Sequence, residues 1–275
     1  MTSPICLDMS APEMITEPAG FQRLRNTHTE PALMKRLRAA FQFITILPAG
    51  KPVDFDPTGM IPFFPVVGLI LGGMLAVFDL LVTQLWSPPV VAILDVLFLI
   101  WITGAFHIDG LGDMADGLYG NRPREKALAI MKDSRVGAMG LVAIVSGLAV
   151  KWGGISEMEA HRSLLLWVIP AFARGSMIFG FRYLPYGRPE GGTGHDFFKE
   201  KPKKAAFIGL LIPILFSLLA GWRGVLVILV FFMVTFGMLM FYKKRMGCIT
   251  GDMLGAMSEI TESALFLTAG LGAGL

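Results

Sequence analysis

The sequence predicts an all-α, polytopic membrane protein with about seven transmembrane helices, and three observations favour this class. Hydrophobic residues make up 54% of the 275 residues and charged residues only 16%, whereas soluble domains average about 25% charged residues. The mean hydropathy is +0.62. The apolar residues also gather in long runs, close to the ~20 residues with which a helix crosses the hydrocarbon core of a bilayer.

The first 33 residues differ from the rest of the chain. They are polar and contain four prolines, Pro4, Pro12, Pro18 and Pro31, which predicts a disordered extension ahead of a transmembrane domain over residues 34–275. They contain no apolar h-region, so we do not expect a secretory signal. Residues 34–44 are basic and amphipathic, a pattern typical of a helix that lies on anionic lipid.

Seven apolar spans follow, and the basic residues suggest their orientation. The spans cover about residues 61–82, 90–106, 136–152, 164–184, 205–220, 225–242 and 253–271. Most of the 24 Lys and Arg residues lie in four segments, 1–60, 107–135, 185–204 and 243–252. Seven spans place all four segments on one side of the membrane. Because cytoplasmic loops carry an excess of Lys and Arg, we expect the N-terminus inside and the C-terminus outside.

An acidic motif follows the second span directly and reads His-Ile-Asp-Gly-Leu-Gly-Asp-Met-Ala-Asp-Gly over residues 107–117. The offsets of Asp109, Asp113 and Asp116 put all three on one helical face, with the outer two about 10 Å apart along the axis. Three carboxylates repel one another unless a cation lies between them, and Mg²⁺ prefers such oxygen ligands. The motif therefore indicates a Mg²⁺ site, with a solvated acidic helix face as the alternative.

A second acidic group lies in the last span. Asp252 and Glu259 are seven residues apart on one helical face, and Glu262 is close to it. Asp252 alone is equally well explained as a helix N-cap. A carboxylate inside the membrane costs about 2.5–3.5 kcal/mol on the insertion scale and usually pairs or binds something. We therefore expect Glu259 to be functional and Asp252 to bind metal or substrate.

The segment between these groups adds candidate phosphate ligands. Lys132 and Arg135 next to a Mg²⁺ site are natural phosphate clamps, and Asp133 is either another ligand or a partner for one of the two cations. The alternative is ordinary cytoplasmic positive charge followed by a helix start at Gly137 and Gly140, whose small size suits tight helix packing.

Other polar residues lie within or beside the spans. Arg174, near the middle of the fourth span, is expected to face a buried acid. Asp79, Asp95 and Lys151 are interpreted as a structural group in which Lys151 pairs with one of the two acids. His107 is a candidate for substrate binding, although a histidine at the start of such a motif is more often a packing or capping residue.

Composition excludes several classes of function. Cys6 and Cys248 give neither a disulfide framework nor a metal-ligand spacing. The net charge of +3 comes without the interleaving of basic and aromatic residues that nucleic-acid binding requires. The expected partner is the lipid bilayer, and the sequence leaves open whether the chain also forms a homo-oligomer.

The residues together suggest transfer of a phosphorylated group, in which carboxylates hold Mg²⁺ and Lys and Arg stabilise developing charge.

Three motifs in this order resemble one known family. They are residues 107–117, residues 131–137 (Met-Lys-Asp-Ser-Arg-Val-Gly) and residues 250–256 (Thr-Gly-Asp-Met-Leu-Gly-Ala), followed by Glu259. Residues 41–48 are also similar. The family is cobalamin synthase, or adenosylcobinamide-GDP ribazoletransferase, and the resemblance runs from Met34 to the C-terminus.

The resemblance implies a multi-pass enzyme of the cell inner membrane whose active site faces the cytoplasm. It implies that adenosylcobinamide-GDP is joined to α-ribazole or its 5′-phosphate with Mg²⁺ as cofactor. The reaction would release GMP and form adenosylcobalamin or its 5′-phosphate. Asp109, Asp113 and Asp116 would then form the metal–phosphate site, and Asp252 and Glu259 would act as further ligands or as the base.

Two alternatives remain at this point. A CDP-alcohol phosphotransferase also presents an Asp-Gly-x-x motif at the membrane face, but this sequence lacks the Ala-Arg that follows it there. An ion-coupled transporter would also explain acids and arginine within the membrane, but here the acids cluster at one face and no pair of matched broken helices is found.

Overall fold

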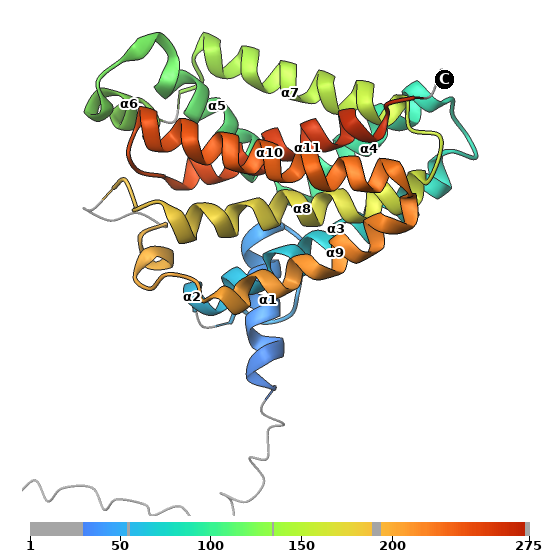
Figure 1. Ribbon diagram of the computed structural model, residues 1–275, viewed down its shortest axis with the longest axis horizontal. Coiled ribbons are helices and arrows are strands. Elements are labelled where there is room, and N and C mark those ends of the chain that lie inside the picture. Colours follow the sequence, from blue (N-terminus) through green and yellow to red (C-terminus); the bar gives the residue numbers. More distant parts are fainter. Residues whose placement is uncertain (1–29, 54–55, 134, 189–193, 273–275) are drawn as a thin grey trace, which may run out of the picture.

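The computed structural model describes residues 30–53, 56–133, 135–188 and 194–272, and every structural statement below concerns these residues. Their regular structure is helical, apart from an isolated bridge between Tyr186 and Ile249. Most helices run side by side in one bundle, and α1 projects from it (Figure 1). The predicted class, an all-α helical membrane bundle, is confirmed. Residues 1–29, most of the predicted N-terminal extension, lie outside the described residues.

The helices follow the predicted spans closely. The α-helices are α1 Ala32–Ile44, α2 Pro57–Met60, α3 Phe64–Val82, α4 Pro88–Thr103, α5 Phe106–Leu118, α6 Arg124–Ile130, α7 Ala138–Ser156, α8 Arg162–Tyr183, α9 Leu211–Ser217, α10 Trp222–Arg245 and α11 Gly251–Ala269. Short 3-10 helices are η2 Ile61–Phe63, η3 Tyr119–Asn121, η4 His195–Phe198, η5 Lys204–Leu210 and η6 Leu218–Ala220. The fifth predicted span is therefore a composite of η5, α9 and η6.

Four of these helical segments are long and apolar enough to cross a membrane alone: Pro57–Val82, α7, α8 and α10. Helices α4 and α5 are bent by 92° and would count as a fifth span if the pair were one crossing. The segment Lys204–Ala220 is apolar but shorter, and α11 carries three carboxylates. Seven crossings and a cytoplasmic N-terminus stay predictions.

The bend between α4 and α5 results from two consecutive residues in the left-handed region. Gly104 has φ 61° and Ala105 has φ 58°. Glycine adopts this conformation freely, whereas an L-residue with a Cβ does so at a cost of about 1–2 kcal/mol. The sequence placed the end of the second span at residue 106. The chain instead turns after Thr103, and the aspartate motif forms a separate helix, α5, that packs on α7 and α11.

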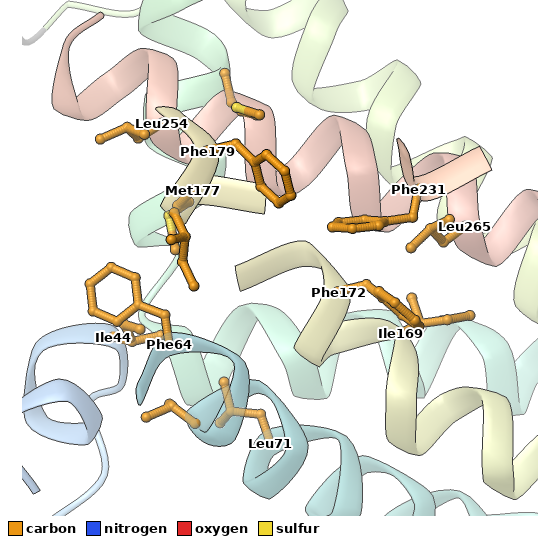
Figure 2. Packing of buried hydrophobic residues seen from close by; sticks show 14 of the residues in the cluster. Ile44, Phe64, Leu71, Ile169, Phe172, Met177, Phe179, Phe231, Leu254 and Leu265 are labelled. Carbon is orange, nitrogen blue, oxygen red and sulfur yellow. The ribbon is translucent and has the colours of Figure 1, made fainter. Parts of the chain in front are cut away.

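The core depends on close packing of α3 along α8. A Cβ added at Gly72 would lie 2.0 Å from the Trp167 carbonyl oxygen, and one at Gly68 would lie 2.4 Å from the Pro170 oxygen. Small residues four apart let two helix backbones approach in this way. On the other side of α8, Phe172 packs against Phe231 of α10 with ring centroids 4.9 Å apart (Figure 2).

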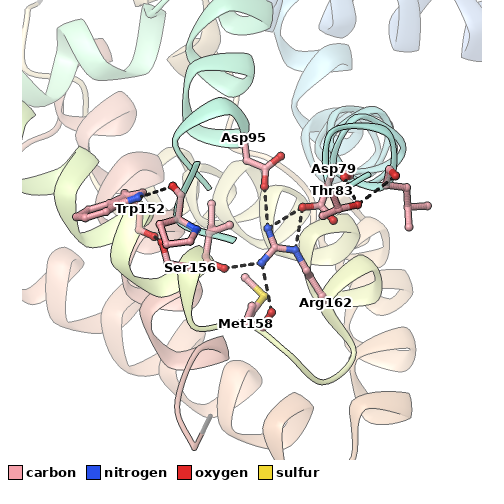
Figure 3. Close-up of polar contacts among 10 residues, drawn as sticks. Asp79, Thr83, Asp95, Trp152, Ser156, Met158 and Arg162 are labelled. Carbon is pink, nitrogen blue, oxygen red and sulfur yellow. Dashed lines mark hydrogen bonds and ion pairs between the residues drawn. The ribbon is translucent and has the colours of Figure 1, made fainter. Parts of the chain in front are cut away.

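An ion cluster joins α3, α4 and α8, and ties them to α7, at the end of the bundle opposite α6 (Figure 1). Arg162 donates to Asp79 at 2.6 and 2.8 Å and to Asp95 at 3.0 Å (Figure 3). Its third nitrogen donates to the carbonyl oxygens of Ile155 in α7 and of Met158 just after it. The prediction that Lys151 pairs with Asp79 or Asp95 was wrong, because Lys151 lies on the face of α7 that meets α11, where it pairs with two other acids.

We expect Gly72→Ala to destabilise the protein by roughly 1–3 kcal/mol, because the new methyl group would overlap the backbone of α8. Thermal unfolding in detergent measures this change. The matched control is Gly73→Ala, whose Cβ would lie 3.6 Å from the Trp167 side chain, an ordinary contact. Equal unfolding temperatures for the two variants would contradict this account of the α3–α8 contact.

Candidate active site

The site is built where α5 and α11 touch through their backbones. A Cβ added at Gly110 would lie 2.8 Å from the Asp252 carbonyl oxygen, and one at Gly255 would lie 3.3 Å from the His107 Cα. The glycines of both motifs therefore let the two acidic helices approach more closely than larger residues allow. This contact brings the start of α11 next to the aspartate face of α5.

Three predicted carboxylates gather around this contact. Asp113 is half-buried and lies within electrostatic range of Asp109, Asp252, Asp116 and Arg188. Asp109 is exposed and also interacts with Asp252. Asp109, Asp113 and Asp252 are called the carboxylate cluster below. The proposed meeting of the two acidic helices is thus present in the structure.

Asp252 is held from two directions. The α11 N-cap is Thr250, which accepts the Met253 amide at 3.2 Å. The Asp252 carboxylate instead accepts hydrogen bonds from Arg188 at 2.6 Å and from the Thr250 hydroxyl at 3.4 Å. The alternative that Asp252 is the N-cap was therefore wrong, because Thr250 caps α11.

Arg188 was missed by sequence reasoning, which counted it only as cytoplasmic positive charge. Its position is fixed by paired backbone: the Gly187 amide donates to the Ile249 oxygen at 2.9 Å, and the Ile249 amide donates to the Pro185 oxygen at 2.9 Å. The sequence feature that could have identified Arg188 is its place in the short segment Pro-Tyr-Gly-Arg-Pro, directly after the fourth predicted span.

Asp116 has a different environment from the other two aspartates of α5. Its carboxylate accepts the amides of Gly137 at 2.6 Å and Gly140 at 2.9 Å, which are orphan donors at the start of α7. A Cβ at either glycine would lie 2.4 Å from an Asp116 oxygen. Asp116 therefore anchors α7 to α5, and its role as a metal ligand stays a prediction.

The candidate phosphate clamp lies in the connection between α6 and α7. Arg135 is exposed and bonds Asp133 through three contacts of 2.5 to 3.1 Å. These hydrogen bonds hold the pKa of the Asp133 carboxyl below its ordinary value. Asp133 is thus the partner of Arg135, one of the options left open. Among the described residues, no hydrogen bond or ion pair joins Lys132 or this pair to the carboxylate cluster.

Glu259 lies in a buried ion network rather than in the carboxylate cluster. Lys151 of α7 donates to Glu259 and to Glu262 at 2.5 Å each, and Arg174 of α8 donates to Glu262. All four side chains are at most 5% exposed. The expected acidic partner of Arg174 is therefore Glu262, which confirms that prediction. A catalytic role for Glu259 stays a prediction.

His107 is buried at the start of α5, and its Nδ1 has no hydrogen-bond partner among the described residues. It lines a narrow cavity with the rings of Phe43, Phe64, Phe106 and Phe181, among others. It also lies within electrostatic range of Arg174, Glu262 and Lys151 of the ion network. The structure thus supports a packing position for His107, and substrate binding by it stays a prediction.

The carboxylate oxygens of the cluster suit a hard cation, but they do not complete its coordination shell. Within the described ranges, no three acidic, histidine or cysteine side chains stand close enough to hold a metal ion by themselves. Carboxylate oxygens are nevertheless the ligands that Mg²⁺ takes together with substrate phosphates. The residues present therefore fit a cation shared with a bound phosphate.

Comparison with known proteins identifies the family. A profile described as cobalamin-5-phosphate synthase matches residues 36–270. The chain belongs to the cobalamin-5-phosphate synthase family. It is 35% identical over 254 residues to an adenosylcobinamide-GDP ribazoletransferase of Alkaliphilus metalliredigens, covering 88% of this chain and 98% of the relative.

Two other curated relatives agree with this family membership, and both are named adenosylcobinamide-GDP ribazoletransferase. The protein of Acinetobacter baumannii strain ACICU is 37% identical, with 83% of this chain and 94% of the relative covered. That of Clostridium acetobutylicum is 30% identical, with 86% and 96% covered. No solved structure matches the chain. Neither the CDP-alcohol phosphotransferase nor the ion-coupled transporter is supported by these matches.

We expect Asp116→Ala to lower the unfolding temperature, because it removes two hydrogen bonds at the start of α7, where loss of a cap costs about 0.5–2 kcal/mol. The matched control is Asp109→Ala, an exposed acid on the same helix, which should unfold close to the wild type. Unfolding in detergent measures both. The anchoring role of Asp116 is refuted if the two variants are equally stable.

Proposed function

We propose that the chain transfers the phosphorylated corrinoid of adenosylcobinamide-GDP to α-ribazole or to α-ribazole 5′-phosphate, with release of GMP. One observation carries the site assignment: the backbone contact of α5 with α11 puts Asp109 and Asp113 beside Asp252. The family membership gives the reaction type. The protein would act in the cell inner membrane with this cluster facing the cytoplasm, the side on which the positively charged segments are expected.

The chemistry requires positive charge next to two phosphates. Mg²⁺, when bound by Asp109 and Asp252 together with substrate oxygens, would neutralise phosphate charge and orient the reacting phosphorus. Arg188 already lies on Asp252 at 2.6 Å, so its guanidinium is placed to bind a phosphate oxygen. The carboxylates therefore bind and orient, and the arginine supplies a fixed positive charge.

The bond changes follow from the products. A hydroxyl oxygen of ribazole attacks the phosphorus attached to the corrinoid, and the bond from that phosphorus to the bridging oxygen breaks, so that GMP leaves with this oxygen. The hydroxyl proton needs an acceptor. Asp113 lies among Asp109, Asp116 and Asp252, and we assign it this role, because a carboxylate within reach of the nucleophile serves as a general base.

Asp113→Asn is expected to reduce GMP release by about 100-fold or more, in the range for loss of a general base, while thermal unfolding stays close to the wild type. The measurement is GMP formed from adenosylcobinamide-GDP and α-ribazole by purified protein. Glu125→Gln, an exposed acid in α6, is the control and should keep its activity. Normal release by Asp113→Asn would remove the cluster from the mechanism.

Chelation tests the cation separately. We expect EDTA to bring transfer to background and added Mg²⁺ to restore it, because the cluster and the substrate phosphates share negative charge that a cation must offset. Unfolding temperature with and without EDTA serves as the control for loss of folded protein. Full activity after EDTA treatment would show that the carboxylates act without a metal.

A further inference from the structure

A cavity next to the segment that carries Arg188 takes no part in the assignment above. It has a volume of about 330 Å³ and is lined mainly by aromatic and basic side chains from the end of α8 and from the segment between α8 and η5: Phe181, Tyr186, His195, Phe198, Lys199 and Lys201. All lining residues are among those that the structure describes. It is called the Tyr186 groove below.

Aromatic rings form one wall of the groove. Tyr186 and Phe198 stack with centroids 4.9 Å apart and an interplanar angle of 30°, and His195 meets the Tyr186 ring edge-on at 6.0 Å. Both stacked residues are half-buried, so part of their surface faces the groove. Such a platform suits a flat heterocycle, because every nucleic-acid base has a face that stacks on aromatic side chains.

Basic side chains form the rim. Lys199 and Lys201 are exposed, and Lys199 pairs with Asp196 at 2.8 Å. Lys201 makes no ion pair within the described part of the chain, so its charge is available to a ligand. A pairing of aromatic wall and basic rim is complementary to a nucleotide, in which a flat base is joined to phosphate.

Two residues of one short segment link the groove to the carboxylate cluster. Tyr186 lines the groove, and Arg188, two positions on, bonds Asp252 of the cluster. Tyr186 interacts electrostatically with both Arg188 and Asp252, and burial raises the pKa of its hydroxyl above the ordinary value. The hydroxyl therefore stays neutral and can both donate and accept hydrogen bonds.

We propose that the Tyr186 groove binds the guanosine of the GDP group, with the base against Tyr186 and Phe198 and the phosphates directed past Lys201 and Arg188 to the carboxylate cluster. This proposal rests on the proposed function. It gives the leaving GMP a site of its own, separate from the site of the ribazole.

The test measures GMP binding and product inhibition with purified protein in detergent. Phe198→Leu keeps an apolar side chain but removes the stacking ring, and Lys201→Gln removes the rim charge. We expect Phe198→Leu to weaken GMP binding by about fivefold or more, in the range found for loss of one base–aromatic stack. Lys201→Gln should also weaken GMP binding, because a charged contact to phosphate is lost. The KM for α-ribazole should be unchanged. Phe198→Tyr should keep the wild-type affinity, and Lys244→Gln, an exposed lysine at the end of α10, is the matched charge control.

Three outcomes overturn the proposal. The first is unchanged GMP affinity in both variants, and the second is an equal loss of GMP affinity in Lys244→Gln. The third is weaker binding of the two variants to anionic vesicles with unchanged GMP affinity, which would make the groove a lipid contact. Thermal unfolding of each variant separates lost binding from lost folding, and Lys201→Gln on the surface keeps the test valid if Phe198→Leu is unstable. A wild-type protein that binds GMP through these residues but forms no product would refute the proposed function and support the groove.

Discussion

The buried ion network of Lys151, Arg174, Glu259 and Glu262 is the constraint on which the site depends. It contains two cations and two carboxylates from α7, α8 and α11, all nearly inaccessible. Buried charges in a membrane protein are tolerated when they are paired, and removal of one partner leaves a costly unpaired charge. The network therefore fixes the rotation and depth of α11. Because Asp252 lies only two turns away, its position relative to α5 is fixed as well.

The site is assembled from rigid helices with one loop contribution. Glycines on α5 and α11 allow the backbone contact that brings the acids together, and Asp116 binds the first turn of α7 to the same helix. Only Arg188 comes from a connecting segment, and its backbone is paired with the residues just before α11. Sites held by helices keep their geometry better than sites on loops. The bent start of α5 at Ala105 thus serves to place the aspartate face across α11.

The sequence predicted the helices, the shared face of the aspartates and the acidic partner of Arg174, because helical period and the cost of membrane charge act locally. It did not predict the partner of Lys151. Several acids lay within reach of that lysine, and the choice among them depends on how α7 is rotated, a property of the whole bundle. The left-handed Ala105 and the contact of Arg188 with Asp252 also arise from tertiary packing, which leaves no periodic pattern in the sequence.

The open arrangement of the carboxylate cluster follows from the charge of its proposed ligand. A pyrophosphate is an anion, and Asp109, Asp113 and Asp252 repel it. Arg188 offsets part of this repulsion but is itself paired with Asp252. We infer that the remaining positive charge arrives with the substrate, as a cation shared between carboxylate and phosphate oxygens. A closed cage of protein ligands would bind the cation without the substrate and leave no coordination position for phosphate. Among the described residues, no three acidic, histidine or cysteine side chains are grouped closely enough to form such a cage.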